Sequence, residues 1–166
     1  PLSINFIKQY AQAGLKNIPL FGPAPLADEQ VIPAVGEPML DVTSSGHWSL
    51  DLNTEANKQF SAAFLKENGK AAELASEQGY TTALVLDAAI KAVKGNIEDK
   101  VAFRKALEAV KVEAPRGPFR FNVDHSPVQN VYLRKVTKDA KGELENTTLK
   151  TIATAHSVND AASCRM

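Results

Sequence analysis

The chain has 166 residues, of which 44% are hydrophobic and 23% are charged, a composition typical of one globular domain. Nineteen basic residues balance nineteen acidic ones, so the charge gives no indication of a nucleic-acid partner or of an anionic membrane surface. No apolar run reaches the roughly 18 residues of a membrane-spanning helix. The single cysteine, Cys164, cannot form a disulfide within the chain, so it leaves the redox compartment open.

The first forty residues predict alternating helices and strands. Gly14 is a helix stop, and Asp28 is placed to cap a short helix that Pro33 should weaken. Such a series predicts a parallel sheet, although two strands are too few to form one that is covered on both faces. The expected elements are a helix over residues 2–13, a strand over 17–21, a rigid loop over 22–25, a helix over 28–35 and a strand over 39–43.

The stretch from Leu40 to Asn53 marks a change of architecture. It begins as an apolar, β-branched run and continues through small polar residues to Trp48 and a helix-capping signal. Helices and strands alternate before it, whereas three amphipathic helices follow it. We interpret it as a strand that leaves one packed unit and passes to another.

The three later helices are predicted over residues 54–68, from 71 or 77 to 93, and from 98 or 99 to 110. The second is apolar over much of its circumference, so we expect it to be heavily buried, with Glu77 on its remaining polar surface. In the third, Val101 is expected to face inward.

The rest of the chain is β-like. Arg116 has the charge for an anion site, but a turn that enters a strand is the expected role. The helices need a sheet to cover that the chain does not visibly contain, so we conclude that strands are missing. The predicted elements are a turn at 116–118, a strand over 119–121, a turn at 124–127, a strand over 128–137, a turn at 138–142, a strand over 149–154 and a frayed last dozen residues.

The sequence contains no evident catalytic or metal-binding constellation. His47, His125 and His156 are widely spaced and lack the company of a metal framework, so we expect no metal and no cofactor. Ser44 and Ser45 stand beside His47, but neighbouring residues on a strand point to opposite faces. A hinge or turn is therefore the preferred interpretation, and a hydrolase the alternative.

Several segments carry a resemblance when their order and spacing are taken together. They cover residues 2–137 and resemble the C-terminal half of periplasmic solute-binding proteins of ABC importers, in the branched-chain amino-acid-binding (Leu/Ile/Val-binding, type I) family. The segments are Phe6-Ile-Lys-Gln-Tyr-Ala-Gln-Ala-Gly14-Leu-Lys16, Ile18-Pro-Leu-Phe-Gly22, Asn57-Lys-Gln-Phe60, Gly79-Tyr80, Ala88-Ala-Ile-Lys91, Pro115-Arg-Gly-Pro-Phe-Arg-Phe121 and Asp124-His-Ser-Pro-Val-Gln-Asn-Val-Tyr132.

The resemblance implies an α/β protein of the type I periplasmic-binding-protein kind, with two Rossmann-like lobes, parallel sheets and a ligand cleft between the lobes. This chain would be an incomplete C-terminal half, which would account for the missing strands. The implied divisions are residues 1–44 in the C-terminal lobe, 45–52 as a hinge crossing, 53–123 in the N-terminal lobe, 124–128 as a second crossing, 129–154 as C-terminal-lobe strands and 155–166 as a tail.

The resemblance also implies ligand-binding positions. In the family the loop after the first predicted strand faces the ligand, which implicates Phe21, Gly22, Ala24 and Pro25. Amino-acid binders carry a carboxylate at the place that corresponds to Ala24, and alanine cannot pair with a ligand's ammonium. The apolar rim therefore fits an aromatic or branched carboxylic acid better than an α-amino acid, unless the missing half supplies the charge.

Two further groups of positions follow from the same resemblance. At the start of the second long helix, Gln78 is the better ligand candidate, whereas core packing is the preferred role of Tyr80. The implied hinge residues are Ser44, Ser45, Gly46, His47 and Trp48.

The function implied by the resemblance is capture of a small organic solute by lobe closure, with no covalent chemistry. The implied partners are that solute, the membrane permease of an ABC importer, and either the N-terminal half of the same protein or a self-association partner. The chain begins at Pro1, so we expect a removed leader or a longer parent chain, exported to the periplasm by a signal peptide. The alternatives are a cytoplasmic ligand-sensing regulator of the same fold and a Ser/His hydrolase.

Overall fold

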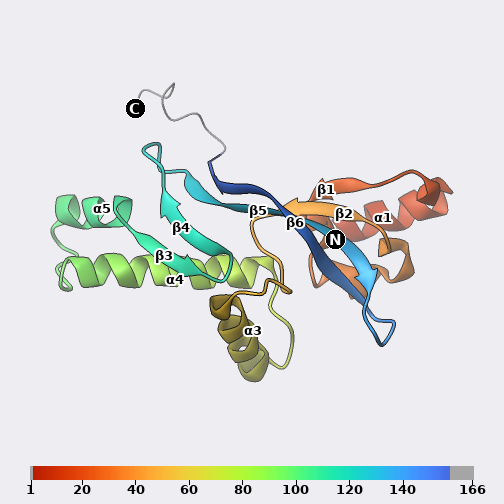
Figure 1. Cartoon of the computed structure of the whole chain (residues 1–166), viewed down its shortest axis with the longest axis horizontal. Helices are drawn as coiled ribbons and strands as arrows, with labels where there is room; N and C mark the ends of the chain where they lie inside the picture. Colours follow the sequence, from red (N-terminus) through yellow and green to blue (C-terminus); the bar gives the residue numbers. More distant parts are fainter. Residues whose placement is uncertain (1, 158–166) are drawn as a thin grey trace.

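The computed structural model describes residues 2–157 and is elongated. Figure 1 shows α1 (Leu2–Gln12) and β1 (Phe21–Pro23) at one end, and α4 (Leu74–Ala92) with α5 (Lys100–Glu108) reaching to the other. The remaining elements are η1 (Leu15–Asn17), η2 (Ala24–Ala27), α2 (Val31–Val35), η3 (Glu37–Met39), β2 (Thr43–Gly46), α3 (Glu55–Asn68), β3 (Lys111–Ala114), β4 (Gly117–Phe121), β5 (Pro127–Lys138) and β6 (Leu144–His156).

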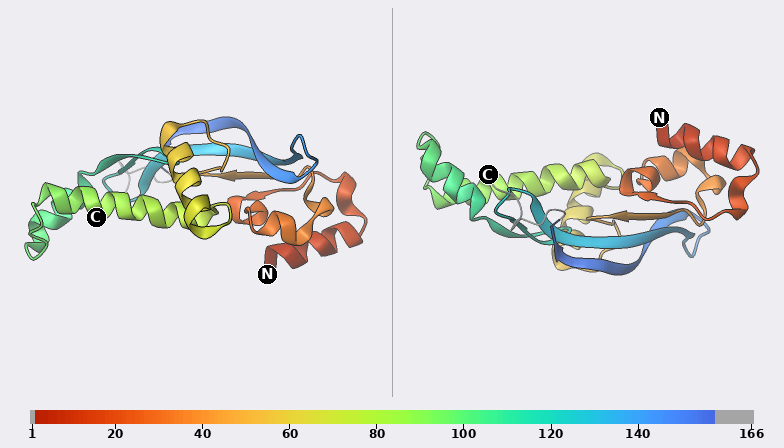
Figure 2. Two further views of the ribbon diagram at one scale, coloured as in Figure 1. Left: turned by 90° about the horizontal axis from the view of Figure 1, so that it is seen from below. Right: turned by 90° about the horizontal axis from the view of Figure 1, so that it is seen from above.

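Strand β5 joins the two ends of the molecule. Its first residues pair antiparallel with β4, where Val128 lies opposite Arg120. Further along, residues 132–135 of β5 pair antiparallel with β2, and β2 in turn pairs in parallel with β1. β6 follows the other edge of β5, and Figure 2 shows α1 and α4 on one and the same side of this β5–β6 ribbon. One strand therefore links the hairpin beside α4 to the sheet beside α1.

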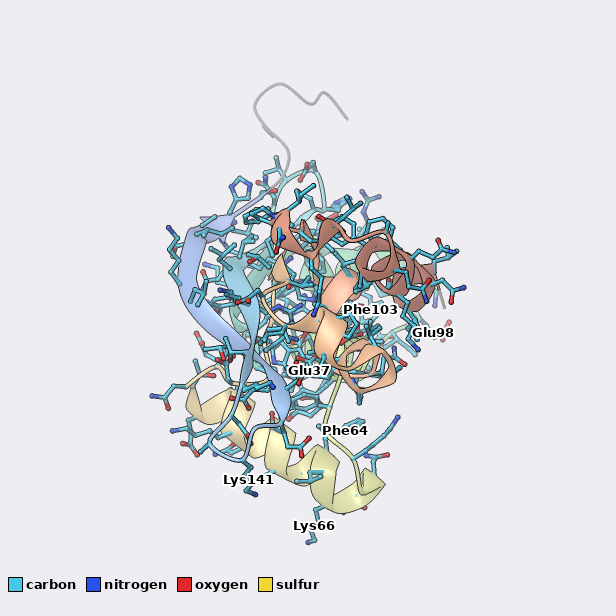
Figure 3. All side chains as sticks on the ribbon, turned by 90° about the vertical axis from the view of Figure 1, so that its right-hand side faces the viewer. Glu37, Phe64, Lys66, Glu98, Phe103 and Lys141 are labelled. Atoms are coloured by element: carbon cyan, nitrogen blue, oxygen red, sulfur yellow. The ribbon has the colours of Figure 1, made fainter. Side chains whose placement is uncertain are left out.

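Helices α3 and α5 form close to where the sequence predicts them, because their end signals are local. The Thr54 hydroxyl accepts a hydrogen bond from the Asn57 amide at the start of α3, and the Asp99 carboxylate caps α5 in the same way. In Figure 3, Phe64 of α3 is turned toward the body of the molecule and Lys66 points away from it. α3 thus presents one apolar side to the core.

The core around α3 is built on the buried Trp48, whose side chain has no exposed surface. Its indole N–H donates to the Asn57 side-chain oxygen over 2.7 Å. The Asn57 amide nitrogen donates in turn to the carbonyls of Leu50 and Leu52, over 2.9 and 3.0 Å. This single asparagine therefore satisfies three buried or part-buried groups of the segment that leads into the helix.

Two strand predictions were displaced along the chain. A strand was expected at 17–21, but Asn17 is the last residue of the 3₁₀ turn η1, and β1 starts only at Phe21. Residues 18–20 belong to neither element. Pro19 in between has no N–H to give to a sheet. The expected strand at 39–43 is likewise a turn followed by β2, because Asp41 adopts a left-handed φ of 71°. Consequently Ser44 and Ser45 lie within β2 itself.

The expectation that α4 is heavily buried was wrong. One side of the helix packs on the core through residues such as Val85 and Ala89, but Leu86 and Ile90 on the other side are 42% and 40% exposed. Val101 of α5, expected to face inward, is 67% exposed. These apolar side chains have no covering layer within residues 2–157, which agrees with the expectation that strands are missing.

The described structure overlaps the expected tail of residues 155–166 only at its beginning. Ala155 and His156 belong to β6, and residues 158–166 of the expected tail, including Cys164, lie outside the described residues. Across residues 2–157, none of the helices combines the length and the apolar character of a membrane span.

Replacing Asn57 with alanine should destabilise the protein strongly. The Trp48 indole N–H would stay buried without an acceptor, and two carbonyls would lose their donor, at a cost of about 2–4 kcal/mol in the free energy of unfolding. Urea denaturation of Asn57→Ala measures this cost. Gln59→Ala, on the exposed side of the same helix, is the control and should change the unfolding free energy by less than about 0.5 kcal/mol. Equal effects of the two substitutions would contradict the role given to Asn57.

Candidate functional site

The carboxyl ends of β1 and β2 lie at one edge of the sheet because the two strands are parallel, with Pro23 opposite Ser45. Ligands of parallel α/β sheets bind outside this edge. Here η2 follows β1, and the segment after β2 leads to Trp48. We call this region, together with the neighbouring start of α4, the strand-end site.

A buried ion pair stands at one side of the strand-end site. Glu77 of α4 has no exposed surface, and the Arg116 guanidinium contacts both of its oxygens, at 2.9 and 2.5 Å. Thr81 donates to the same carboxylate over 2.6 Å, and Arg116 also donates to the Gln129 side-chain oxygen over 2.8 Å. The pair therefore connects α4, the β3–β4 turn and the start of β5, and both charges are bonded.

His47 faces this ion pair without being bonded to it. Its Nε2 lies 3.7 Å from the nearer Glu77 oxygen and has no hydrogen-bond partner among the described residues. Burial, reinforced by the positive charges of Arg116 and Arg134, lowers the pKa of His47 from 6.5 to about 4. The ring is therefore neutral near pH 7, and its side chain is 16% exposed. The unpaired Nε2 is itself buried in this arrangement.

A second buried cation lies under the site. Arg134 of β5 has no exposed surface, and its guanidinium donates to the Trp48 carbonyl over 3.3 Å, to the Ala24 carbonyl over 3.1 Å and to the Ser44 hydroxyl over 3.2 Å. Its nearest carboxylate is Glu29, at 3.8 Å. Arg134 thus ties β2, η2 and the segment after β2 to the central strand.

The surroundings of Glu29 favour the protonated, uncharged form of its carboxyl group. Burial, together with a hydrogen bond involving Asp28, raises the pKa of Glu29 from 4.5 to about 7, although Asn146 and the positive charge of Arg134 lower it in part. The Asn146 side chain donates to Glu29 over 2.9 Å and to the Ala27 carbonyl over 2.7 Å. These contacts fix the loop after β1 to β6.

The implied ligand loop divides into buried and exposed members. Ala24 is 4% exposed and packs with Trp48, whereas Phe21, the first residue of β1, is 69% exposed. Gly46 approaches this loop so closely that a side-chain carbon on it would lie 2.5 Å from the Ala24 methyl. Pro25 is exposed and Gly22 is half-buried.

The second predicted wall is on α4. Tyr80 is 44% exposed, with its ring centre 4.9 Å from that of Phe60. Gln78 is exposed and lines a hollow of about 320 Å³ together with Thr81, Thr82, Val85 and Arg116. The structure therefore places Gln78 beside the buried ion pair, but it gives Tyr80 a packing partner.

The predicted hinge residues lie in two settings. Ser44, Ser45 and Gly46 are part of β2, while His47 and Trp48 follow it. Ser44 is almost fully buried and its hydroxyl accepts a hydrogen bond from Arg134, which does not prepare it as a nucleophile. Trp48 packs in a cluster with Leu74.

Several site residues were missed from sequence. Glu77 was expected on a helix surface and is instead fully buried, where it is paired with Arg116. The sequence did not show this pairing because the two residues are 39 positions apart. Arg134 and Glu29 stood in unremarkable positions of a strand and a loop. A charge inside an otherwise apolar strand pattern, as at Arg134, is the one signal that could have pointed to a buried polar network. No group of three metal-ligating side chains comes together in residues 2–157.

Comparison with known proteins gives consistent matches. The family model described as "Periplasmic binding protein" matches residues 1–142. A "Leu/Ile/Val-binding protein homolog 6" of Brucella suis is 35% identical over 159 residues, which are 91% of this chain and 40% of that protein. The chain therefore spans less than half the length of the curated relatives it matches.

Solved structures match over nearly the whole chain. A solute-binding protein of an ABC transporter from R. palustris, in complex with benzoate, is 32% identical with a TM-score of 0.87, over 99% of this chain and 43% of that one. A solute-binding protein from Rhodopseudomonas palustris in complex with 3,4-dihydroxybenzoic acid is 30% identical with a TM-score of 0.84, over 94% and 43% of the two chains. The fold class implied by the sequence resemblance is confirmed.

The raised pKa of Glu29 and the lowered pKa of His47 predict opposite changes of folding stability with pH. Between pH 4.5 and 7 the folded protein holds a proton on Glu29 that the unfolded chain releases, so this group lowers stability as pH rises. Between pH 4 and 6.5 the unfolded chain protonates His47 while the folded protein does not, so this group raises stability as pH rises. Each contribution is on the order of 3 kcal/mol at about 1.4 kcal/mol per pH unit of displacement.

Glu29→Gln should therefore make the free energy of unfolding rise more steeply between pH 4.5 and 6.5 than it does in the parent protein. His47→Gln should make it fall over the same range. Urea unfolding at several pH values gives both slopes, and the change in slope is independent of any constant loss of stability in a variant. Parallel curves for all three proteins would contradict these pKa assignments.

Proposed function

This chain belongs to the periplasmic binding protein family, and we propose that it is one part of a two-lobed solute-binding protein that serves an ABC importer. Its match to less than half of each relative supports this, as do the bare apolar faces of α4 and α5. On this proposal residues 1–44 and 129–154 contribute to one lobe and residues 53–123 to the other. The chain passes between the lobes at 45–52 and 124–128.

The missing partner layer would cover specific surfaces. Leu86 and Ile90 of α4 stand out on the side away from the core, and β1 has a neighbour on only one of its edges in residues 2–157. An apolar helix face and an open strand edge are favourable only when another layer pairs with them. The rest of the same protein is the proposed occupant, and a second copy of this chain would replace it when the rest is absent.

The proposed solute is an aromatic carboxylic acid. The observation that carries this choice is Ala24, a methyl group at the position where amino-acid binders place a carboxylate. Two buried acids close by are already engaged, because Glu77 is bonded to Arg116 and Asp28 accepts a backbone hydrogen bond from Leu74. A third, Glu29, has a pKa raised to about 7 and so carries only part of a negative charge near pH 7. An unpaired ammonium in this cleft would cost several kcal/mol.

Neighbouring residues suit an aromatic acid. Phe21, the first residue of β1, is exposed and offers a flat ring for contact. His47 adds a neutral ring whose side chain is 16% exposed. The relatives bound to benzoate and to 3,4-dihydroxybenzoic acid support the same class. A branched-chain amino acid is the second candidate, favoured by the name of the Brucella relative.

Binding would work by closure of the two lobes. Contacts that the solute makes with both walls stabilise the closed arrangement relative to the open one, and only this difference drives closure. No covalent step is needed. The proposed location is the periplasm, with export by a signal peptide encoded upstream of Pro1, and the closed form would deliver the solute to a membrane permease.

Calorimetric titration of the full-length protein separates the candidate solutes. We expect benzoate or 4-hydroxybenzoate to bind with a dissociation constant in the micromolar range or below, about −8 kcal/mol. We expect leucine to bind at least tenfold more weakly. Tighter binding of leucine would assign the second candidate, and no binding of any of these compounds would contradict the proposed solute class.

Phe21→Ala should weaken the binding of the aromatic acid by roughly two- to tenfold, because a ring contact contributes about 0.5–1.5 kcal/mol. Phe6→Ala is the matched control, since Phe6 is an exposed aromatic residue on α1. Its substitution should leave the affinity unchanged. Equal losses in the two variants would remove Phe21 from the site.

A further inference from the structure

Asp28 does not cap the short helix that directly follows it. Its side chain, 7% exposed, accepts a hydrogen bond from the Glu29 amide over 2.9 Å. The same oxygen accepts a hydrogen bond from the backbone amide of Leu74 over 3.2 Å, and Leu74 is the first residue of α4. The carboxylate therefore spans from the loop after β1 to a helix 46 residues further along the chain.

Helix α4 needs such a contact because it does not cap itself. Its own N-cap residue, Glu73, makes no side-chain capping hydrogen bond. By contrast, α3 is capped by Thr54 and α5 by Asp99, each from within its own sequence. The first amides of a helix have no partner inside the helix, and a carboxylate near them is also favoured by the helix dipole. Asp28 supplies the cap that the local sequence omits.

The loop that carries Asp28 is held firmly on its other side. The carbonyl of Ala24 accepts from Arg134 of β5 over 3.1 Å, and the carbonyl of Ala27 accepts from Asn146 of β6 over 2.7 Å. Both contacts are buried. The loop thus cannot follow α4 if α4 moves relative to the β5–β6 ribbon, so the contact of Asp28 with Leu74 must break instead.

We propose that Asp28 is a positioning residue for solute binding, which caps α4 from across the cleft only when the two walls are close together. This rests on the proposed function, in which α4 and the loop after β1 belong to different lobes. The arrangement described here resembles that of the benzoate-bound relative. The cap therefore adds to the stability of the closed form, and its loss speeds release of the solute.

The proposal is tested with Asp28→Ala, Asp28→Asn and the control Asp99→Ala in the full-length protein, with benzoate as the probe. A cap of this kind changes an equilibrium by roughly three- to tenfold. Asp28→Ala should weaken benzoate binding by that factor, mainly through faster dissociation measured by stopped flow. Asp28→Asn keeps a capping oxygen and should stay within about twofold of the parent. Asp99→Ala removes an equivalent cap from α5 and should leave both rates unchanged.

A measurement on the unaltered protein covers the case in which Asp28→Ala does not fold. Benzoate should slow hydrogen exchange of the Leu74 amide, read by NMR, more than that of the Ala102 amide, which Asp99 caps in both forms. Unchanged Leu74 exchange with benzoate bound, or parent-like dissociation from Asp28→Ala, would overturn the role of Asp28 while leaving the proposed function standing. Failure of the parent protein to bind benzoate would overturn the proposed function, and this proposal with it.

Discussion

The buried guanidinium of Arg134 holds together segments that are far apart in the sequence. A charged group with no exposed surface is tolerated only when hydrogen bonds replace its water. Here the replacements are the Trp48 and Ala24 carbonyls and the Ser44 hydroxyl, 86, 110 and 90 residues away along the chain. The end of β2, the start of η2 and the segment before α3 must therefore converge on one point of β5. The strand-end site exists because of this convergence.

Strand β5 gives the site its second property, contact with both parts of the molecule. Near its start it carries Gln129, which bonds to Arg116 and so reaches the ion pair on α4. Further along it carries Arg134, which holds the loop after β1. A solute at the strand-end site would lie between these two anchored walls. On the proposed function this strand would connect the two lobes, as a cleft that closes by hinge motion requires.

The sequence predicted those parts of the fold whose signals are local. Thr54 and Asp99 predict the starts of α3 and α5, because each capping side chain lies three residues before the amide that it bonds. The position of β2 was displaced because the left-handed turn at Asp41 delays the strand, and nothing in an apolar run shows that. The partners of Glu77, Asp28 and Arg134 were out of reach, since each is fixed by packing between distant segments. The resemblance to a known family predicted the fold class, which the residue patterns alone did not.

The central claim is that this chain forms part of a cleft that closes on an aromatic acid. Small-angle X-ray scattering of the full-length protein, with and without saturating benzoate, tests it most directly. Closure of two lobes predicts a smaller radius of gyration with benzoate than without it. An unchanged radius of gyration, in a protein that calorimetry shows to be saturated, would contradict the account.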